Sequence, residues 1–217
     1  MKNAVRVRRG RMLALCFAAL ALIAVAWSAA VTAPEDEIPA GYTSIGNSFA
    51  HFSSDDVEVV TAEGEVLYSV PFDYDRRTLT PSGEGAAAWA PGESMLLLGE
   101  GGYLNVEPEG ELLGVFGSVG GAVCAVCETR DGPAVTVYRG STAVFSLECE
   151  SFFPLAAAVS PYGSELALLC ADGAGYALRT YSLSGGSVSV DRLDGAAAGL
   201  TWVSDDPEIL YVDGNGV

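Results

Sequence analysis

After residue 42, short apolar runs alternate with turns of Gly, Asp, Ser and Pro, and no stretch keeps a helical period. In four places, two runs rich in β-branched and aromatic residues flank a short turn that contains glycine, which is typical of a β-hairpin. The predicted hairpins are 57–61 with 65–70, 103–106 with 111–116, 135–138 with 142–147, and 176–183 with 187–190. This pattern predicts an all-β fold of antiparallel strands.

The hairpins recur at a nearly regular distance. Their turn glycines Gly64, Gly110, Gly140 and Gly185 are 46, 30 and 45 residues apart. A period near 40 residues with several strands per unit is typical of the blades of a β-propeller. Small apolar segments lie between the hairpins, and the most regular of them reads as strand, tight turn and strand around Ser160-Pro161-Tyr162-Gly163. A β-sandwich would also give short strands at regular spacing.

About four blade equivalents fit into residues 42–217, and the sequence ends just after a predicted inner strand pair. Propellers have about four to eight blades, and most with this repeat length are larger. We therefore expect a partial β-propeller-like domain, either a fragment of a longer one or a domain that closes by self-association.

The N-terminal residues predict a membrane segment. Residues 12–31 form a run of 20 residues without a charge, and five cations precede it. As a helix, this run would span the roughly 30 Å of a bilayer core, and the cations favour a cytoplasmic N-terminus. We predict a basic cytoplasmic tail at 1–11, a transmembrane signal-anchor helix at 12–31, a linker at 32–41 and an extracytoplasmic domain at 42–217. A cleaved signal peptide is the alternative, because 24–26 and 28–30 fit a small-x-small cleavage pattern.

The charge balance excludes several partners. The chain has 11 Lys and Arg against 28 Asp and Glu, and only six of the cations follow residue 12, which leaves that part at −22. Little basic charge remains to neutralise phosphates, so we expect no nucleic-acid binding. The expected partners are the membrane, through the N-terminal helix, and an unidentified extracytoplasmic protein or ligand.

Cysteine and histidine are the side chains that most often carry redox or metal chemistry. Cys124 and Cys127 form a C-x-x-C inside a predicted strand, where positions i and i+3 point to opposite faces and their sulfurs cannot meet. We expect Cys124, Cys127, Cys149 and Cys170 to pack in the core; disulfides, with three possible pairings, are the alternative. His51 is the one histidine and is expected to be structural or solvated.

The remaining motifs do not complete a site. No HExxH, G-x-S-x-G or P-loop pattern occurs. Asp213-Gly214-Asn215-Gly216 matches half of a calcium loop, and we expect a turn there because no distal glutamate follows. Asp55-Asp56 and Asp205-Asp206 are predicted to be solvated turns. The sequence thus predicts no catalytic residue, no cofactor and no metal ligand.

Three segments carry a resemblance to a known family: 46–72, 79–93 (LTPSGEGAAAWAPGE) and 159–186, which contains VSPYGSELALLCADG. They resemble bacterial membrane-anchored proteins with a WD40/YVTN-like β-propeller domain of unknown function, over about the first half of that domain. The resemblance implies one N-terminal span and a propeller outside the cell, and no site. We expect a non-enzymatic binding scaffold; the alternatives are a glycan- or peptide-processing enzyme that uses loop carboxylates, or an inactive truncated product.

Overall fold

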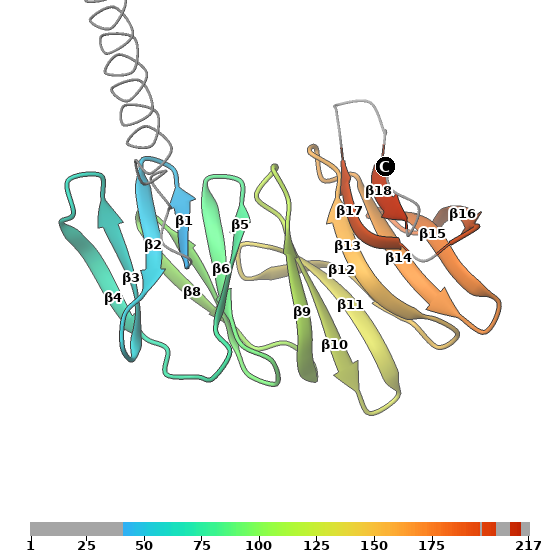
Figure 1. The fold of residues 1–217 in the computed structure, drawn as a ribbon, viewed down its shortest axis with the longest axis horizontal. Helices are drawn as coiled ribbons and strands as arrows, with labels where there is room; N and C mark the ends of the chain where they lie inside the picture. Colours follow the sequence, from blue (N-terminus) through green and yellow to red (C-terminus); the bar gives the residue numbers. More distant parts are fainter. Residues whose placement is uncertain (1–40, 196, 203–208, 214–217) are drawn as a thin grey trace, which may run out of the picture. The chain divides into compact units, whose positions relative to one another are not determined.

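The computed structural model describes residues 41–195, 197–202 and 209–213. This part of the chain is all-β and contains four four-stranded antiparallel sheets followed by a two-stranded sheet (Figure 1). Each sheet is built from strands that are consecutive in the sequence. We number the sheets 1 to 5 in chain order.

Sheet 1 contains β1 (Tyr42–Ile45), β2 (Ser48–Phe52), β3 (Asp56–Thr61) and β4 (Val66–Pro71). Sheet 2 contains β5 (Thr78–Ser82), β6 (Gly85–Trp89), β7 (Met95–Gly99) and β8 (Gly102–Val106). Sheet 3 contains β9 (Glu111–Gly117), β10 (Val123–Thr129), β11 (Gly132–Arg139) and β12 (Thr142–Glu148). Sheet 4 contains β13 (Phe153–Val159), β14 (Glu165–Asp172), β15 (Gly175–Ser182) and β16 (Ser187–Leu193), and sheet 5 contains β17 (Ala197–Trp202) and β18 (Ile209–Asp213).

The first strands of successive sheets lie side by side: β1 contacts β5, β5 contacts β9, β9 contacts β13, and β13 contacts β17. The core therefore consists of apolar layers between neighbouring sheets rather than one central cluster.

The sequence of strand β6 is a continuous apolar run because both of its faces are buried. Ala86 and Ala88 pack towards sheet 1, while Ala87, on the opposite face, packs with Met95, Val115 and Val123 between sheets 2 and 3. A strand buried on both faces has no solvent side and does not alternate with polar residues.

Three of the four predicted hairpins are confirmed, as β3–β4, β11–β12 and β15–β16. The predicted strand, tight turn and strand around Ser160–Gly163 is also confirmed, as β13 and β14. The count of about four units is confirmed as well, because the structure has four complete sheets and one further strand pair.

The predicted hairpin of 103–106 with 111–116 is wrong. Its first run is β8, which pairs with β7 across Glu100 and Gly101, and its second run is β9, the first strand of the next sheet. Residues 107–110 are thus a connection between sheets. Gly110 is needed there for a different reason: its φ is +126° and a Cβ would overlap the carbonyl oxygen of Glu128. With Gly101 in place of Gly110, the turn glycines are 37, 39 and 45 residues apart, which is a more regular repeat.

The four separate sheets differ from the β-sandwich alternative, which has two. Within the described residues, no helix is long and apolar enough to cross a membrane. The predicted tail at 1–11, the transmembrane segment at 12–31 and nearly all of the linker at 32–41 lie outside the described residues, so their placement stays a prediction.

Candidate binding groove

The turns at the ends of sheets 1, 2 and 3 form an open groove with a volume of about 570 Å³. It is lined by the turn residue Gly46 of sheet 1, by Glu84 and by 97–104 of sheet 2, and by Gly121 and Gly140 of sheet 3. These turns lie at the same end of their sheets. In a sheet of consecutive antiparallel strands, the chain returns to the same end after every two strands. The groove therefore collects residues from three sheets that are distant in sequence.

Apolar side chains form part of the groove. Three apolar residues of the layers between the sheets also line the groove. Leu98 belongs to the layer between sheets 1 and 2, and Leu97 and Val123 belong to the layer between sheets 2 and 3. Tyr103 and Leu104 of β8 also line it and are about half exposed, at 50% and 47%. A half-exposed aromatic and leucine beside a cavity offer apolar area that a ligand could bury.

Two glycines of the groove lie so close to neighbouring atoms that a side chain would not fit there. A Cβ at Gly85 would lie 2.7 Å from the carbonyl oxygen of Leu98, so no larger residue fits between β6 and β7 at this point. Gly46 has a φ of +55°, and a Cβ there would lie 2.8 Å from Oε1 of Glu100. The backbone of the groove is thus exposed where side chains would otherwise fill it.

Sheet 1 holds the β7–β8 turn in place through two sets of hydrogen bonds. The backbone N–H of Asn47 donates to Oε1 of Glu100 at 2.6 Å, and the hydroxyl of Ser48 donates to the same oxygen at 3.3 Å. The hydroxyl of Tyr68 lies 2.7 Å from the carbonyl oxygen of Gly99 and 3.0 Å from that of Gly102, and burial raises the pKa of this tyrosine. The groove is therefore preformed at the Glu100 end.

The charged side chains that line the groove are the acids Glu84 and Glu100. Among the described residues, Glu84 has no ion-pair or hydrogen-bond partner, and Oε2 of Glu100 has none either. The nearest arginine in sequence is Arg139, which precedes the lining residue Gly140. Its guanidinium donates to the carbonyl oxygens of Tyr162 at 3.3 Å and Gly163 at 2.7 Å in sheet 4. The groove therefore has a negative rim.

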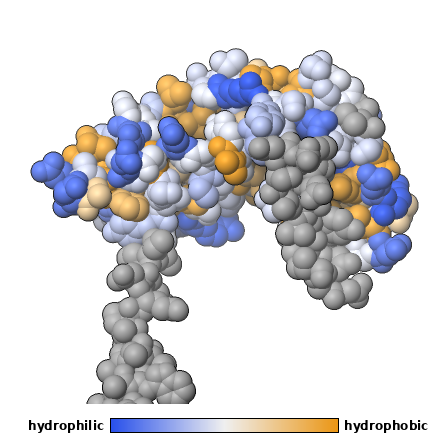
Figure 2. Space-filling view, turned by 90° about the horizontal axis from the view of Figure 1, so that it is seen from above, coloured by the Kyte–Doolittle hydropathy of each residue, from blue (hydrophilic) through white to orange (hydrophobic). Residues whose placement is uncertain are grey.

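Figure 2 shows the side of the molecule that lies at the top of Figure 1, where the turns of β1–β2 and β5–β6 lie. Hydrophobic residues form separate patches among hydrophilic ones on this side. Single exposed apolar residues are usual on a protein surface, so the groove is distinguished by its shape and its acids rather than by apolar area alone.

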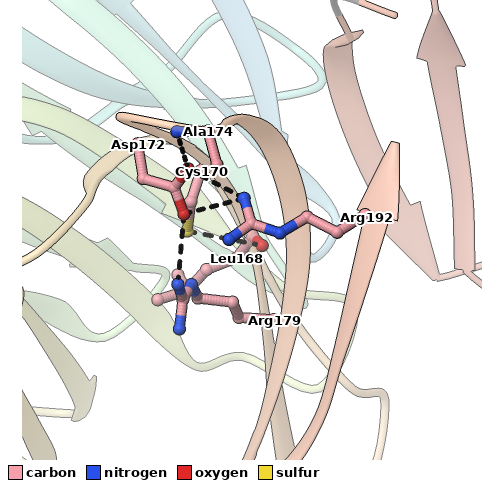
Figure 3. A network of polar contacts seen from close by, with 6 residues as sticks. All are labelled: Leu168, Cys170, Asp172, Ala174, Arg179 and Arg192. Carbon is pink, nitrogen blue, oxygen red and sulfur yellow. Dashed lines mark hydrogen bonds and ion pairs between the residues drawn. The ribbon is translucent and has the colours of Figure 1, made fainter. Parts of the chain in front are cut away.

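A second polar cluster, on sheet 4, serves a structural purpose (Figure 3). Asp172 at the end of β14 accepts hydrogen bonds from Arg192 of β16 at 2.8 and 2.9 Å, from the backbone N–H of Ala174 at 2.9 Å and from Arg179 of β15 at 3.4 Å. The Arg192 hydrogen bonds, followed by that of Ala174, lower the pKa of Asp172 to about 2. A carboxylate that stays ionised and fully bonded ties strands together and cannot act as a general acid near neutral pH.

Arg179 is mostly buried beside this carboxylate. Its guanidinium lies 4.3 Å from the centre of the Phe152 ring. Its Nε is the one buried side-chain nitrogen or oxygen without a hydrogen-bond partner among the described residues. Arg179 therefore joins an ion pair and a cation–π contact in the layer between sheets 3 and 4.

The four cysteines of the β-domain, Cys124, Cys127, Cys149 and Cys170, are buried free thiols. As predicted, the C-x-x-C pair points to opposite faces of β10. Cys124 packs in the layer between sheets 3 and 4 with Cys149 and Cys170, whereas Cys127 packs between sheets 2 and 3. Burial raises the pKa of Cys124, and it raises those of Cys127 and Cys149 to about 11 and that of Cys170 to about 12. Such thiols are poor nucleophiles and ligands at neutral pH.

His51, which was expected to be structural or solvated, lies in β2 and is part of a local contact. Its ring stacks on Tyr42 with centroids 4.7 Å apart, and its Nε2 is 3.5 Å from Oε2 of Glu58. Asp55 is exposed in the bend that precedes β3. The prediction of a solvated turn is wrong for Asp56, which is the first residue of β3 and accepts a hydrogen bond from the Ser69 hydroxyl at 3.1 Å.

Other predicted candidates fall partly outside the described residues, namely Asp205-Asp206 and the Gly214-Asn215-Gly216 part of the half calcium loop. In the part of the chain that the structure describes, no three His, Cys, Asp or Glu side chains are grouped to hold a metal ion. The sequence alone does not indicate the groove residues. Glycines, leucines and two glutamates from separate turns form no motif, and their grouping depends on how the sheets pack.

No family model matches the sequence, and no curated protein matches it either. Solved structures do share its fold. Hydrazine synthase from Kuenenia stuttgartiensis has 14% identity and a TM-score of 0.53, over 75% of this chain and 51% of that one. BBS1N, from its complex with ARL6DN, has 12% identity and a TM-score of 0.54, over 82% and 61%. The complex of KlAtg21 with the coiled-coil of AgAtg16 contains a match with 10% identity and a TM-score of 0.55, over 77% and 61%.

The chain thus spans between half and about three fifths of the structures that it matches. At these identities the likeness concerns the fold alone, because one fold hosts many functions.

Proposed function

We propose that the protein is a membrane-anchored, extracytoplasmic scaffold that binds a ligand or protein through a β-propeller-like domain. The observation that carries this proposal is the repeat of four sheets with the same order, in which each first strand contacts the first strand of the next sheet. Such an arrangement is that of successive propeller blades. It gathers hairpin turns on one side, where the groove lies.

The anchor is supported by the sequence. Five cations precede a run of 20 uncharged residues, a pattern that favours an N-terminus in the cytoplasm and the following domain outside. The resemblance of 46–72, 79–93 and 159–186 to membrane-anchored propeller proteins agrees with this topology. The negative charge of the domain suits a body that stays away from anionic lipid surfaces.

A topology experiment tests the proposal. The full chain with a C-terminal epitope tag is expressed in a bacterial host, and the membranes are washed with alkaline carbonate. We expect the protein to stay in the membrane pellet, and the tag to be lost when protease is added to intact spheroplasts. Release of the domain by carbonate would favour the cleaved signal peptide, and a tag that is digested only after lysis would contradict an extracytoplasmic domain.

A matched control uses the N-terminal cations. Replacing the five Lys and Arg residues of segment 1–11 by Gln removes the charge bias but leaves the apolar run intact. Because that bias sets the orientation, we expect a fraction of this variant to become protected from external protease. An unchanged orientation would show that the cations do not determine it.

A further inference from the structure

We propose that the outer face of sheet 1, which is the face turned away from sheet 2, is an interface that binds the same face of a second copy of this chain. Sheet 1 is the first in the row of sheets (Figure 1). The proposal goes beyond a binding scaffold, and one of its arguments rests on the proposed membrane anchor.

The strand register places four apolar residues next to one another on this outer face. Phe49 of β2 pairs with Val60 of β3, and Val60 pairs with Val66 of β4. Directly paired residues of neighbouring strands point to the same side of a sheet. Tyr68 packs towards sheet 2, so its neighbour Leu67 points to the outer face. Together these side chains form one apolar row across three strands.

The apolar row is exposed in a single chain, whereas the faces of the inner sheets are covered. Phe49, Val66 and Leu67 remain 38%, 56% and 46% exposed. Sheets 2 and 3 are each packed between two neighbouring sheets through apolar layers. A contiguous apolar patch rimmed by polar residues typically marks an interaction site. The outer face of sheet 1 therefore offers the same kind of surface that joins the other sheets.

The polar residues beside the row bond to neighbours within the sheet. The ring of His51 stacks on Tyr42, and its Nε2 lies 3.5 Å from Oε2 of Glu58. The hydroxyl of Ser69 donates to Asp56 at 3.1 Å. An occupant of this face therefore has to supply an apolar surface rather than an opposite charge, and the same face of a second copy supplies one.

The proposed anchor favours a second copy over an unrelated protein. Residues 32–41 join the predicted span at 12–31 to sheet 1, and ten residues reach at most about 35 Å. Two anchored copies share one orientation and are confined to one surface, which raises their effective concentration. A two-fold axis along the membrane normal brings the two identical faces together, and an isologous contact uses the same residues on both sides.

The net charge of the domain predicts how this contact responds to salt. Residues after 12 carry −22, so two copies repel each other. Salt screens this repulsion, with a Debye length of about 8 Å at physiological ionic strength. Dimerisation should therefore become tighter when salt is added, whereas a contact held by opposite charges would become weaker.

Sedimentation equilibrium of the full chain in an uncharged, density-matched detergent tests the proposal. We expect a monomer–dimer equilibrium that shifts towards the dimer with added salt. Val66→Asp should raise the dissociation constant at least about tenfold, because it places like charges in the apolar contact of both copies. Val190→Asp is the matched control, since Val190 is 46% exposed on β16, the fourth strand of sheet 4; it should change the constant by less than about twofold.

Three results of this experiment would overturn the proposal. The first is a chain that stays monomeric up to about 100 µM. The second is a dimer that dissociates as salt is added. The third is an equal effect of Val66→Asp and Val190→Asp, which would place the contact elsewhere, for example in the N-terminal segment.

Cross-linking in membranes identifies the occupant without an added charge. In a Cys16→Ser background, Val66→Cys and Val190→Cys are each treated with a bifunctional maleimide; the four cysteines of the β-domain are buried. We expect a product of twice the chain mass for Val66→Cys alone. No product, or a product of another mass, would refute the second copy as the occupant.

The outcomes of this test and of the topology experiment are independent. A dimer in detergent together with a failed topology experiment would leave the interface in place and refute the anchor. A monomer together with a successful topology experiment would refute the interface, and the anchored scaffold would stand.

Discussion

Gly117 of β9, the first strand of sheet 3, passes close to the backbone of β5, the first strand of sheet 2. A Cβ at this position would overlap the carbonyl oxygen of Pro81 in β5 and would lie 2.8 Å from its carbonyl carbon and 3.0 Å from Cβ of Ser82. Carbon atoms in contact are normally about 3.5–4.0 Å apart. The Gly117→Ala variant therefore requires β5 and β9 to separate by about 1 Å, and an overlap between a Cβ and backbone atoms cannot be relieved by changing a rotamer.

The loss of stability in Gly117→Ala depends on which atoms the new Cβ would overlap. Overpacking in a protein core typically costs about 1–3 kcal/mol, and an overlap with backbone lies at the upper end because no side chain can move aside. Separation of β5 from β9 also loosens the layer that contains Ala87, Val115 and Val123. We expect the free energy of unfolding to fall by about 3 kcal/mol.

Urea denaturation of the full chain in uncharged detergent, followed by tryptophan fluorescence, measures this effect. With a slope of about 1–3 kcal/mol per molar urea, the midpoint should fall by about 1–3 M. Gly173→Ala is the matched control, because a Cβ at Gly173 has no neighbour within 4 Å and its φ is not positive; that variant should be unchanged or slightly more stable. A Gly117→Ala midpoint equal to that of the control would refute the packing of β9 against β5.

Further variants test the layers and the sheet 4 network. Because Leu168 is fully buried between sheets 3 and 4, Leu168→Ala should lower the free energy of unfolding by about 2–5 kcal/mol, and a loss no larger than that of the exposed Leu67→Ala would argue against this layer. The pKa of Asp172 is about 2 in the folded state and about 3.9 in an unfolded chain, so its stabilisation is present above about pH 4 and is lost as the pH falls towards 2; denaturation of Asp172→Asn should lack this pH-dependent part, and parallel pH profiles would contradict it. In a Cys16→Ser background, Ellman's reagent at pH 8 should leave the four buried thiols unmodified in the folded protein and modify all of them in guanidinium, whereas rapid modification without denaturant would show that the layers are open.

Much of the fold could be predicted from the sequence, because short-range signals determine hairpins. The Gly-bearing turns at Gly64, Gly140 and Gly185 join consecutive strands whose pairing needs no information from elsewhere. The error at Gly110 has a physical cause. A glycine that passes close to the backbone of Glu128 resembles a turn glycine in the sequence, and the difference depends on a contact between β8–β9 and β10.

The candidate groove could not be predicted in the same way. Glu84 and Glu100 are 16 residues apart and lie in different turns, and Gly46 and Gly140 belong to sheets 1 and 3, on either side of sheet 2. Their proximity follows from how whole sheets pack. The Asp172–Arg192 ion pair could not be predicted from the sequence either. It forms because β14, β15 and β16 lie side by side, and the strand register decides which acid faces which base.

The consecutive strand order in every sheet also has a consequence for how the chain folds. Each ladder of sheet 1 closes within residues 42–71, and each ladder of sheet 4 within 153–193. Short loops close with little loss of chain entropy, and a low contact order favours rapid folding. We therefore expect individual sheets to nucleate independently during synthesis, and the slow step to be the docking of completed sheets onto one another.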